Sequence, residues 1–561
     1  MTRADAAVAA AFLLYAVVFH MGRWQAAVPF VYLSGDAGNI ASYAAGLDHP
    51  ELFAGDGMLG DPARLAFYRP LHVPLVRALA RVAGDYGTAF ISLLAPHVLL
   101  MALGFYVLGR VLFASRYWAA LLAVANLMPV PLNLGEFWGV YLDPLPRVTY
   151  QALLPFVLSL AIVWRERPAR WPWLMLLAGA LVYVHPVSAP AWSLALWLGL
   201  WSWRPPRWSP AGRVARMLLL GALVPLAGAH FALAVLDGRA SGAAPFEAVY
   251  PVLRASLPRG YFDVSFALRE FVSGWSGLRA LPWAWAACGL AVLIRLGGRG
   301  RERLPVLGLW AVGLAAVSVL VPACEQQLLS RARLPLAIDL IRGIRYCVPL
   351  MLLVALWPLA ELHARAGRRG ARAAAAAGLA LTACWIAWHP PREVGSAVAC
   401  WAGGRVGCPA AGWVEAREAL DAIRRETPPG APLLSTELAL PIRYYALRPV
   451  VQDYRDLGIL LYANHAGLPA WQRVFRERSR IAGIRDRARR LRAFLALAEE
   501  TGAAYVLADA TYLPAPGPAP PHALVWRNRV WALIRLGGSY GLRLPREHLQ
   551  AVDARSGRRG P

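Results

Sequence analysis

The chain has 561 residues, of which 58% are hydrophobic and only 16% are charged. Soluble domains average about 45–50% apolar and about 25% charged residues, so this composition predicts an integral membrane protein. The net charge of +25 would also suit a nucleic-acid-binding protein. However, the basic residues fall in short clusters between apolar segments, which is typical of cytoplasmic loops and argues against nucleic acid as a partner.

About eleven apolar segments approach the length of roughly 20 residues that a membrane-spanning helix needs. We expect them at 6–22, 88–110, 117–134, 148–164, 171–185, 187–203, 214–236, 281–296, 304–322, 341–361 and 371–389. No small-residue cleavage site follows the first segment, so we interpret it as a retained span. Residues 171–203 form either two half-spanning helices or one kinked helix, because Pro186 disfavours helix at His185.

Arginine clusters lie between alternate spans and orient them. Positively charged loops stay in the cytoplasm, and all of these clusters fall on one side if the eleven spans are real. The sequence therefore predicts a multi-pass membrane protein with a cytoplasmic N-terminus and an extracytoplasmic C-terminus. The clusters are Arg3; Arg110 and Arg116; Arg165, Arg167 and Arg170; Arg204, Arg207 and Arg213; Arg295, Arg299, Arg301 and Arg303; and Arg365, Arg368 and Arg369.

The predicted organisation is a transmembrane helical domain over residues 1–389 and an extracytoplasmic α/β domain over 390–540. The first extracytoplasmic loop is long, at 23–87. A later one contains the amphipathic stretch "FDVSFALREFVSGW", which suits a membrane surface. Residues 541–561 have little apolar content, and we expect them to be disordered.

Helix and strand signals alternate in the C-terminal region. The expected helices are "WVEAREALDAIRR" and "AGIRDRARRLRAFLALAEE", the second closed by Gly502. The expected strands lie in "APLLSTE", "RPVVQDY" and "AAYVLAD", followed by a hairpin that turns at Asn528. Cys400 and Cys408 lie in a Gly-rich stretch just after the last span, and on an oxidising side of the membrane we expect them to form a disulfide.

The first loop holds five acids within a short stretch of an otherwise acid-poor chain: Asp36, Asp48, Glu51, Asp56 and Asp61. Asp36 lies near the membrane surface between Gly35 and Gly38, which allow close approach of a substrate. A carboxylate there could act as a general base. With Asp56 it could instead hold a divalent cation such as Mg²⁺ or Mn²⁺. The alternative is that these acids cap helices and turns.

Cationic side chains on the same side could bind a phosphate, for which the guanidinium group is well shaped. Arg342 and Arg345 share one helix face at the start of the tenth span, and Arg69 lies close to His72 in the first loop. His185 is a further candidate for substrate binding, and Glu136 is a lesser one. The alternatives are arginines that reach lipid headgroups non-specifically and a histidine that serves packing.

The first loop and the tail together resemble the GT-C superfamily of membrane glycosyltransferases, and in particular a bacterial branch of it. The matching features are Asp36 followed by "LDHPELFAGD", which ends at Asp56, and "RPVVQDY", "WQR" and "GAAYVLAD" in the tail. The resemblance implies a location in the bacterial inner membrane, a catalytic acid in the first loop and a sugar donor linked to polyprenyl phosphate. The acceptor would be an extracytoplasmic glycan, lipid or protein. The alternatives are a transporter or flippase and a non-catalytic scaffold with the same fold.

Overall fold

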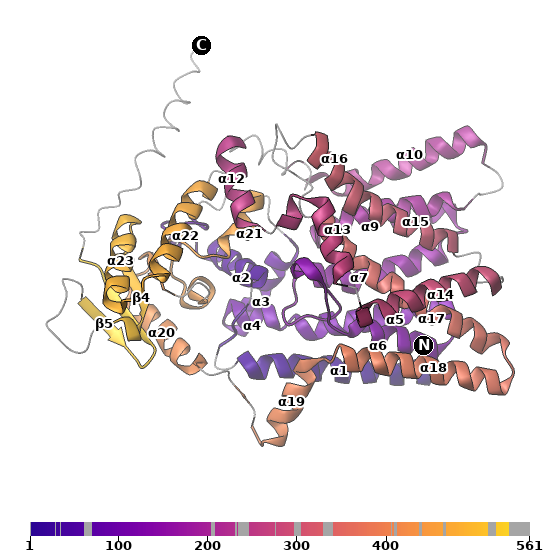
Figure 1. Ribbon diagram of the computed structural model, residues 1–561, viewed down its shortest axis with the longest axis horizontal. Helices are drawn as coiled ribbons and strands as arrows, with labels where there is room; N and C mark the ends of the chain where they lie inside the picture. The colour runs from indigo at the N-terminus through magenta and orange to yellow at the C-terminus, as the bar shows by residue number, and fades with distance from the viewer. Residues whose placement is uncertain are drawn as a thin grey trace, which may run out of the picture.

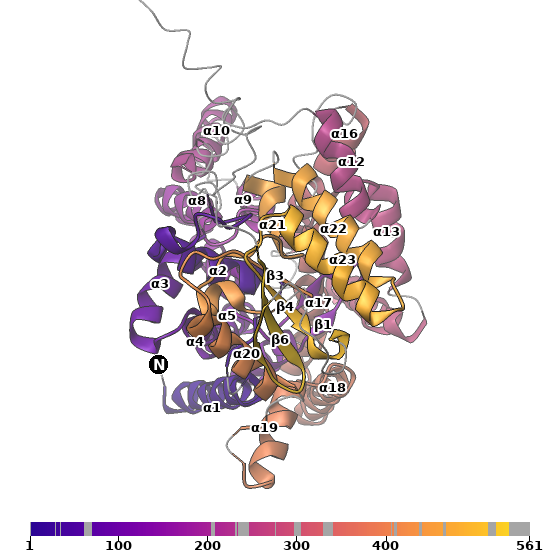
Figure 2. The ribbon, with the colours of Figure 1, turned by 90° about the vertical axis from the view of Figure 1, so that its left-hand side faces the viewer.

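The computed structural model describes residues 2–27, 30–33, 35–60, 70–203, 208–230, 233, 246–257, 259–274, 277–296, 304–328, 340–405, 407–408, 412–436, 440–463, 467–513 and 523–537. A long bundle of helices makes up most of the molecule, and a smaller α/β unit, which we call the tail, covers one end of it (Figure 1). Figure 2 looks onto that end, where the strands and helices of the tail lie in front of the bundle.

Each of the eleven apolar segments coincides with a helix of the bundle. Seven helical stretches of the described chain are long and apolar enough to cross a membrane, and Leu281–Arg295 is a shorter apolar helix. The chain is therefore a multi-pass membrane protein, while the number of eleven spans remains a prediction. The helices are α1 (Arg3–Ala27), α5 (Leu94–Phe113), α6 (Arg116–Leu127), α7 (Pro146–Val163), α8 (Trp171–Ala180), α9 (Ser188–Trp201), α10 (Pro210–Ala227), α14 (Leu281–Leu296), α15 (Leu304–Ala315), α17 (Cys347–Arg365) and α18 (Arg368–Trp388).

The segment 171–203 forms two separate helices. α8 ends in the short 3₁₀ helix η5 (Leu181–Tyr183), and the chain turns at Pro186 before α9 begins. With a rise of 1.5 Å per residue, each helix measures about 15–21 Å, which is well short of a bilayer core of about 30 Å. The two helices fit the half-spanning interpretation of this segment.

Shorter elements cluster at the end of the bundle next to the tail. The predicted amphipathic stretch forms α13, where Asp263 caps the helix by accepting a hydrogen bond from the amide of Phe266 at 2.8 Å. The elements at this end are α2 (Gly35–Asp48), α3 (His72–Ala83), α4 (Tyr86–Ile91), β1 (Val130–Pro131), η3 (Asn133–Gly135), β2 (Phe137–Trp138), α12 (Phe246–Ser256), α13 (Val264–Ser273), α16 (Val321–Leu328), η9 (Leu340–Tyr346) and α19 (Arg392–Ala402).

The tail is built on a four-stranded sheet with strand order β3-β4-β6-β5. β3 and β4 run parallel, whereas β6 is antiparallel to both β4 and β5. The elements are α20 (Trp413–Glu426), β3 (Leu433–Ser435), α21 (Asp456–Ala463), α22 (Leu468–Ala482), α23 (Arg487–Glu500), β4 (Tyr505–Asp509), β5 (Ala523–Arg527) and β6 (Trp531–Arg535).

Alternation along β4 explains the layers of the tail. Tyr505 and Leu507 share a core with the apolar face of α20, whereas Val506 and Ala508 share another with α22 and α23. Successive side chains of a strand point to opposite faces of a sheet. α20 therefore covers one face of the sheet, and α22 and α23 cover the other, so both faces are buried.

The sequence predicted most of these elements but not all. The expected strand "RPVVQDY" is wrong, because only Val450 of this segment forms an isolated bridge, to Leu433. The residues after it turn into a buried polar network described below. The hairpin does turn at Asn528, whose Oδ1 accepts the amides of Val530 and Trp531. The expected disorder of 541–561 lies outside the described residues.

The structure joins Cys400 and Cys408 in a disulfide, which is the pairing that the sequence predicts. Cys400 lies in the last turn of α19, and its Cα lies 6.1 Å from that of Cys408, which follows the helix. Three of the free cysteines, Cys288, Cys324 and Cys384, are exposed on the protein surface.

We therefore expect mass spectrometry of the unreduced protein, after alkylation in denaturant, to find Cys400 and Cys408 unmodified and linked to each other. The free cysteines serve as internal controls, because the denaturant makes all of them accessible to the reagent. Alkylation of both Cys400 and Cys408 without reductant would contradict the disulfide and the oxidising location of the tail.

Candidate functional site

Four charged side chains meet where the bundle adjoins the tail. Glu136 follows η3, Arg147 lies in the first turn of α7, and Arg342 and Arg345 both lie on η9. Nη1 of Arg345 is 2.5 Å from Oε2 of Glu136, and Nε of Arg342 donates to Oε1. Nη1 of Arg147 lies 3.7 Å from the same Oε1. One carboxylate thus contacts three guanidinium groups, and the two on η9 lie 206 and 209 positions from it in the sequence. We call the three arginines around Glu136 the arginine cluster.

The hydroxyl group of Ser188 is a second hydrogen-bond partner of Arg345, whose side chain is almost fully buried. Its Nη2 donates to Oγ of Ser188 at 3.0 Å. Ser188 is held in turn by His185, because Nδ1 of His185 accepts from the Ser188 amide at 3.2 Å and lies 2.8 Å from its Oγ. An Nδ1 that accepts carries no proton, so the ring proton lies on Nε2. His185 therefore reaches the arginine cluster through Ser188.

Two guanidinium groups of the arginine cluster, those of Arg147 and Arg345, share one carboxylate. Among the described residues, Glu136 is the one acid that pairs with Arg147 or Arg345. The Nε atoms of both arginines are buried and have no hydrogen-bond partner there. Because a buried charge without a counter-charge costs several kcal/mol, the arginine cluster is suited to binding an anion.

The same guanidinium groups control the ionisation of Glu136. Burial alone would raise the pKa of its carboxyl group. The charges of Arg342, Arg345 and Arg147 outweigh burial and hold the pKa below its usual range. Glu136 therefore stays ionised, and it orients the arginines without neutralising them.

A small cavity of about 20 Å³ lies beside the arginine cluster. It holds about one water molecule and is too small for a phosphate group. The arginine with the most exposed side chain is Arg342, so an anion has to enter past it. The cavity is lined by Asn133, Glu136, Gly260, Phe271, Ile341, Arg342, Ile344 and Arg345, and Asp36 is not among them.

His72 lies in a separate contact and does not reach an anion. It begins α3 and is buried, with Nε2 at 2.8 Å from Oγ1 of Thr149 on α7. Burial and the neighbouring His97 lower the pKa of His72 to about 3, so its ring is neutral near pH 7 and cannot attract a phosphate. The predicted substrate-binding role is therefore not supported, and His72 instead helps to attach α3 to α7. The predicted partner Arg69 lies outside the described residues.

Asp36 keeps an available carboxylate. It lies in the first turn of α2, is partly exposed, and forms no hydrogen bond or ion pair with another described residue. Gly458 of the tail faces it, because a Cβ added there would lie 3.6 Å from Oδ1 of Asp36. Asp36 is therefore placed where the first loop meets the tail, and it retains both oxygens for a substrate.

Asp56 has the opposite character, and the predicted catalytic role is not supported. Its side chain is fully buried. Oδ1 accepts the amides of Met58 and Leu59 at 2.9 and 2.8 Å. Oδ2 accepts the Val450 amide and the Nε of Arg443, both at 2.7 Å. Because both oxygens are occupied, Asp56 anchors the first loop to the tail, and Asp36 and Asp56 do not form a cation site.

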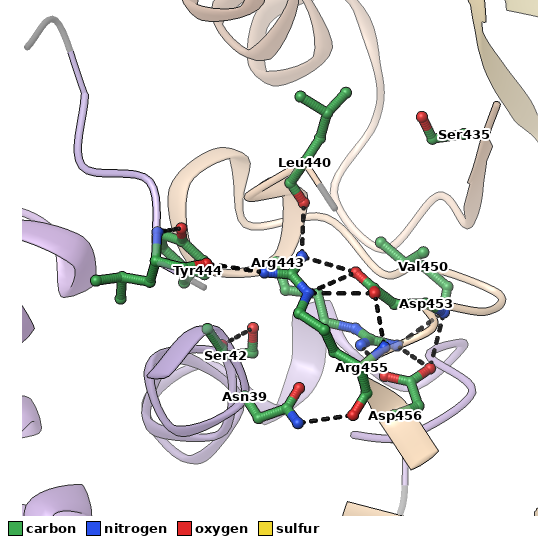
Figure 3. A network of polar contacts seen from close by, with 12 residues as sticks. Asn39, Ser42, Ser435, Leu440, Arg443, Tyr444, Val450, Asp453, Arg455 and Asp456 are labelled. Carbon is green, nitrogen blue, oxygen red and sulfur yellow. Dashed lines mark hydrogen bonds and ion pairs between the residues drawn. The ribbon is translucent and has the colours of Figure 1, made fainter. Parts of the chain in front are cut away.

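Arg443, the partner of Asp56, belongs to a larger polar network, which Figure 3 shows. Arg443 also pairs with Asp456, whose Oδ2 accepts the amide of Asp453 at 2.9 Å. Asp453 in turn pairs with Arg455 at 2.8 Å. With Asp56, the three buried carboxylates exceed the two guanidinium groups by one charge. Burial, opposed by Arg443, raises the pKa of Asp456 to about 6, so this carboxyl group takes up a proton at a higher pH than an ordinary aspartate does.

The network continues into the helix that carries Asp36. The side-chain amide of Asn39 on α2 donates to the carbonyl of Arg455 at 2.7 Å. The guanidinium group of Arg455 lies against Gly38 and donates to the carbonyl of Leu33 at 3.3 Å. A side chain at Gly38 would displace this guanidinium group. The tail therefore fixes the first turn of α2, and with it the position of Asp36.

No metal site emerges from the part of the chain that the structure describes. No group of three or more His, Cys, Asp and Glu side chains there could hold a metal ion. The Mg²⁺ or Mn²⁺ that the sequence left open as an option thus has no multidentate protein site among these residues, and we derive no chemical step from it.

Sequence reasoning found part of this site. It named Arg342, Arg345 and His185, and it ranked Glu136 low although this acid holds the arginine cluster together. It missed Arg443, Arg455 and Asp456 because nothing in a single sequence shows that these charges are buried. A usable signal was present in "QDYRD", where charges interrupt an otherwise apolar segment.

No protein-family model matches the sequence, and no curated protein sequence matches it significantly. The structure is similar to the crystal structure of ArnT from Cupriavidus metallidurans in the apo state, with 13% identity and a TM-score of 0.45 over 95% of this chain and 98% of that chain. The structure of ArnT bound to undecaprenyl phosphate matches with 14% identity and a TM-score of 0.44, over 94% and 97%. A likeness at this level leaves the reaction to be argued from the site itself.

We predict that Asp56→Asn weakens the attachment of the first loop to the tail. The side-chain NH₂ group of asparagine would face either the guanidinium group of Arg443 or a backbone amide that now donates to Asp56, so at least one of these hydrogen bonds would be lost. Breaking a buried ion pair costs about 3–5 kcal/mol. Thermal unfolding and limited proteolysis of the purified protein measure the loss. Glu51→Gln, an exposed change in the same loop, is the matched control and should behave as the wild type. Equal stability of Asp56→Asn and the wild type would show that the anchor contributes nothing.

Proposed function

We propose that the chain is a bacterial inner-membrane glycosyltransferase that moves a sugar from a polyprenyl-phosphate-linked donor to an extracytoplasmic acceptor. The observation that carries this proposal is the buried excess of positive charge around Glu136. Such a site, at the end of a membrane bundle, suits a phosphate group attached to a lipid, provided that the partly exposed side chain of Arg342 moves to enlarge the small cavity beside it. The acceptor is a glycan, lipid or protein that carries a hydroxyl group.

The arginine cluster suits the change in charge during the reaction. The phosphodiester of the donor carries one negative charge. When the bond between the sugar and the phosphate oxygen breaks, the electron pair stays on that oxygen, and the lipid phosphate leaves with a second negative charge. Preorganised donors aimed at a developing charge lower the barrier most. Arg345, fixed by Glu136 and Ser188, is such a donor, and Arg342 is the more exposed group that the phosphate meets first.

Asp36 supplies the general base in this proposal. Its oxygens are available, so it can accept the proton of the acceptor hydroxyl as that oxygen attacks the sugar. The tail holds α2 in place, and it also forms the surface from which an acceptor would approach. The donor phosphate is thus bound by the bundle and the acceptor by the first loop with the tail. The donor sugar has to bridge these two places.

The orientation of the chain follows from the same proposal. The loops rich in arginine would face the cytoplasm, and the arginine cluster, Asp36 and the tail would share the extracytoplasmic side. The disulfide between Cys400 and Cys408 supports this orientation, because disulfides persist in oxidising compartments.

The proposal predicts different kinetic defects for the two groups. Asp36→Asn should lower kcat by about 100-fold or more with little effect on donor KM, since a general base contributes about 10²–10⁴. Arg345→Met should lower kcat/KM for the donor by about 100-fold or more, which is the effect of removing one preorganised donor. Transfer from a radiolabelled polyprenyl-phosphate sugar in membranes measures both.

Glu51→Gln is again the control and should retain full transfer. Full activity of Asp36→Asn would show that Asp36 is not the general base. Flux of the lipid-linked sugar across proteoliposomes without any covalent product would instead identify a flippase.

A further inference from the structure

A cavity of about 780 Å³ lies where α12 meets α22 and α23 of the tail. We call it the tail cavity. Figures 1 and 2 show α22 between the other two helices, and α12 packs against it through Val249, Val252 and Leu253. The volume is in the range of small-molecule sites, about 300–1,000 Å³, and such sites often lie where two parts of a protein meet. The tail cavity is separate from the site described above, because neither Asp36 nor Glu136 lines it.

One face of α22 brings positive charge to the tail cavity. Arg473, Arg476 and Arg480 follow one another at the spacing of helical turns, so they share that face, and all three line the cavity. Arg480 pairs with Glu477, which also lines it. The guanidinium groups of Arg473 and Arg476 are exposed and form no ion pair with any other described residue. These two groups are therefore available to an anion.

Gln472 provides an independent sign of a ligand. It is only 8% exposed, lines the tail cavity, and its side chain forms no hydrogen bond within the part of the chain that the structure describes. Buried polar groups are normally hydrogen-bonded, and a side-chain amide offers two donors and one acceptor. A ligand with hydroxyl groups would satisfy this amide.

The rest of the lining combines an apolar floor with further polar groups. Val252, Val474 and Leu497 come from the three different helices and are buried. Glu500 and Thr501, at the end of α23, also line the cavity. A sugar ring has C–H faces that can lie on such a floor and hydroxyl groups that can donate to a carboxylate. The lining therefore suits a saccharide, and the arginines add a place for an acidic group.

The opposite side of α22 is held by the buried polar network of the tail. Nε1 of Trp471 donates to the carbonyl of Asp453 at 2.8 Å. Nη1 of Arg478 donates to Oε1 of Gln452 at 2.8 Å. These contacts fix the helix before any ligand binds, so its arginine face is already in place. Such preorganisation lowers the entropic cost of binding.

We propose that the tail cavity is a binding site for an acidic saccharide, a sugar that carries a phosphate or carboxylate group. Arg473 and Arg476 bind the acidic group, and Gln472 and Glu500 bind hydroxyl groups of the sugar. The apolar floor contacts the ring. The inference goes beyond the proposed function, because it requires neither the lipid-linked donor nor a transfer step.

The test measures binding to the full-length protein in phosphatidylcholine nanodiscs by ligand-observed NMR titration. The acidic probes are trehalose 6-phosphate and digalacturonate, which distinguish a phosphate from a carboxylate. Trehalose and inorganic phosphate are the neutral and the sugar-free comparison. We expect at least one acidic probe to bind about tenfold or more tightly than both, since a hydrogen bond to a charged group contributes about 1.5–3 kcal/mol. Added salt should weaken this binding, because exposed charges are screened.

Variants place the binding in the tail cavity. Arg473→Gln combined with Arg476→Gln should weaken it by about tenfold or more, for the same reason. The matched control combines Arg487→Gln with Arg492→Gln. It makes the same change of charge at two exposed positions of α23 that do not line the cavity, and it should bind as the wild type does.

Two further variants separate the possible explanations. Gln472→Met keeps the length of the side chain but removes the amide, and it should weaken binding of the acidic probe by about threefold to tenfold, the value of one hydrogen bond. Arg345→Met, in the arginine cluster, should leave this binding unchanged. Size-exclusion chromatography and thermal unfolding verify that each variant folds.

Several results would overturn the inference. They are no binding of either acidic probe, equally tight binding of trehalose or inorganic phosphate, and unchanged binding when Arg473 and Arg476 are both replaced. Loss of binding in Arg345→Met would place the probe at the arginine cluster instead. A failure of the proposed function is distinct: binding in the tail cavity without any sugar transfer would reject the transferase alone, and transfer without this binding would reject the saccharide site alone.

Discussion

The contact between Glu136 and three arginines is the constraint on which the functional account depends. One buried carboxylate contacts Arg147, Arg342 and Arg345. It is the one acid among the described residues that pairs with Arg147 or Arg345, and it is too little charge to balance these two. A protein that needed these groups only for stability would gain from a second acid or from apolar replacements. The surplus charge at the end of a membrane bundle is therefore best explained by a ligand that brings its own negative charge.

A second buried network gives the other half of the site its geometry. Asp56 and Arg443 join the first loop to the tail, and Arg455 extends this attachment to α2. Asp36 is left as the available carboxylate beside the attachment. Asp56 is buried and has a structural role, whereas Asp36, whose carboxylate is available, is the acid of this loop that we propose as the general base.

The sequence predicted the helices of the bundle well because apolar segments of this length have few alternatives in a membrane. It also predicted β4, the turn at Asn528 and the pairing of Cys400 with Cys408. It was wrong about the strand at 448–454, and the catalytic role that it offered for Asp56 is not supported by the buried contacts of this carboxylate. In both cases the outcome depends on charges buried between segments far apart in the chain, and local patterns carry no information about such partners. The low rank of Glu136 has the same cause.

A cryo-EM structure of the protein in nanodiscs with a bound polyprenyl phosphate tests the central claim most directly. The account predicts that the phosphate lies within hydrogen-bond distance of Arg345 and Arg342, with Glu136 still paired to the guanidinium groups. A phosphate bound away from η9, with the arginine cluster unchanged, would contradict it.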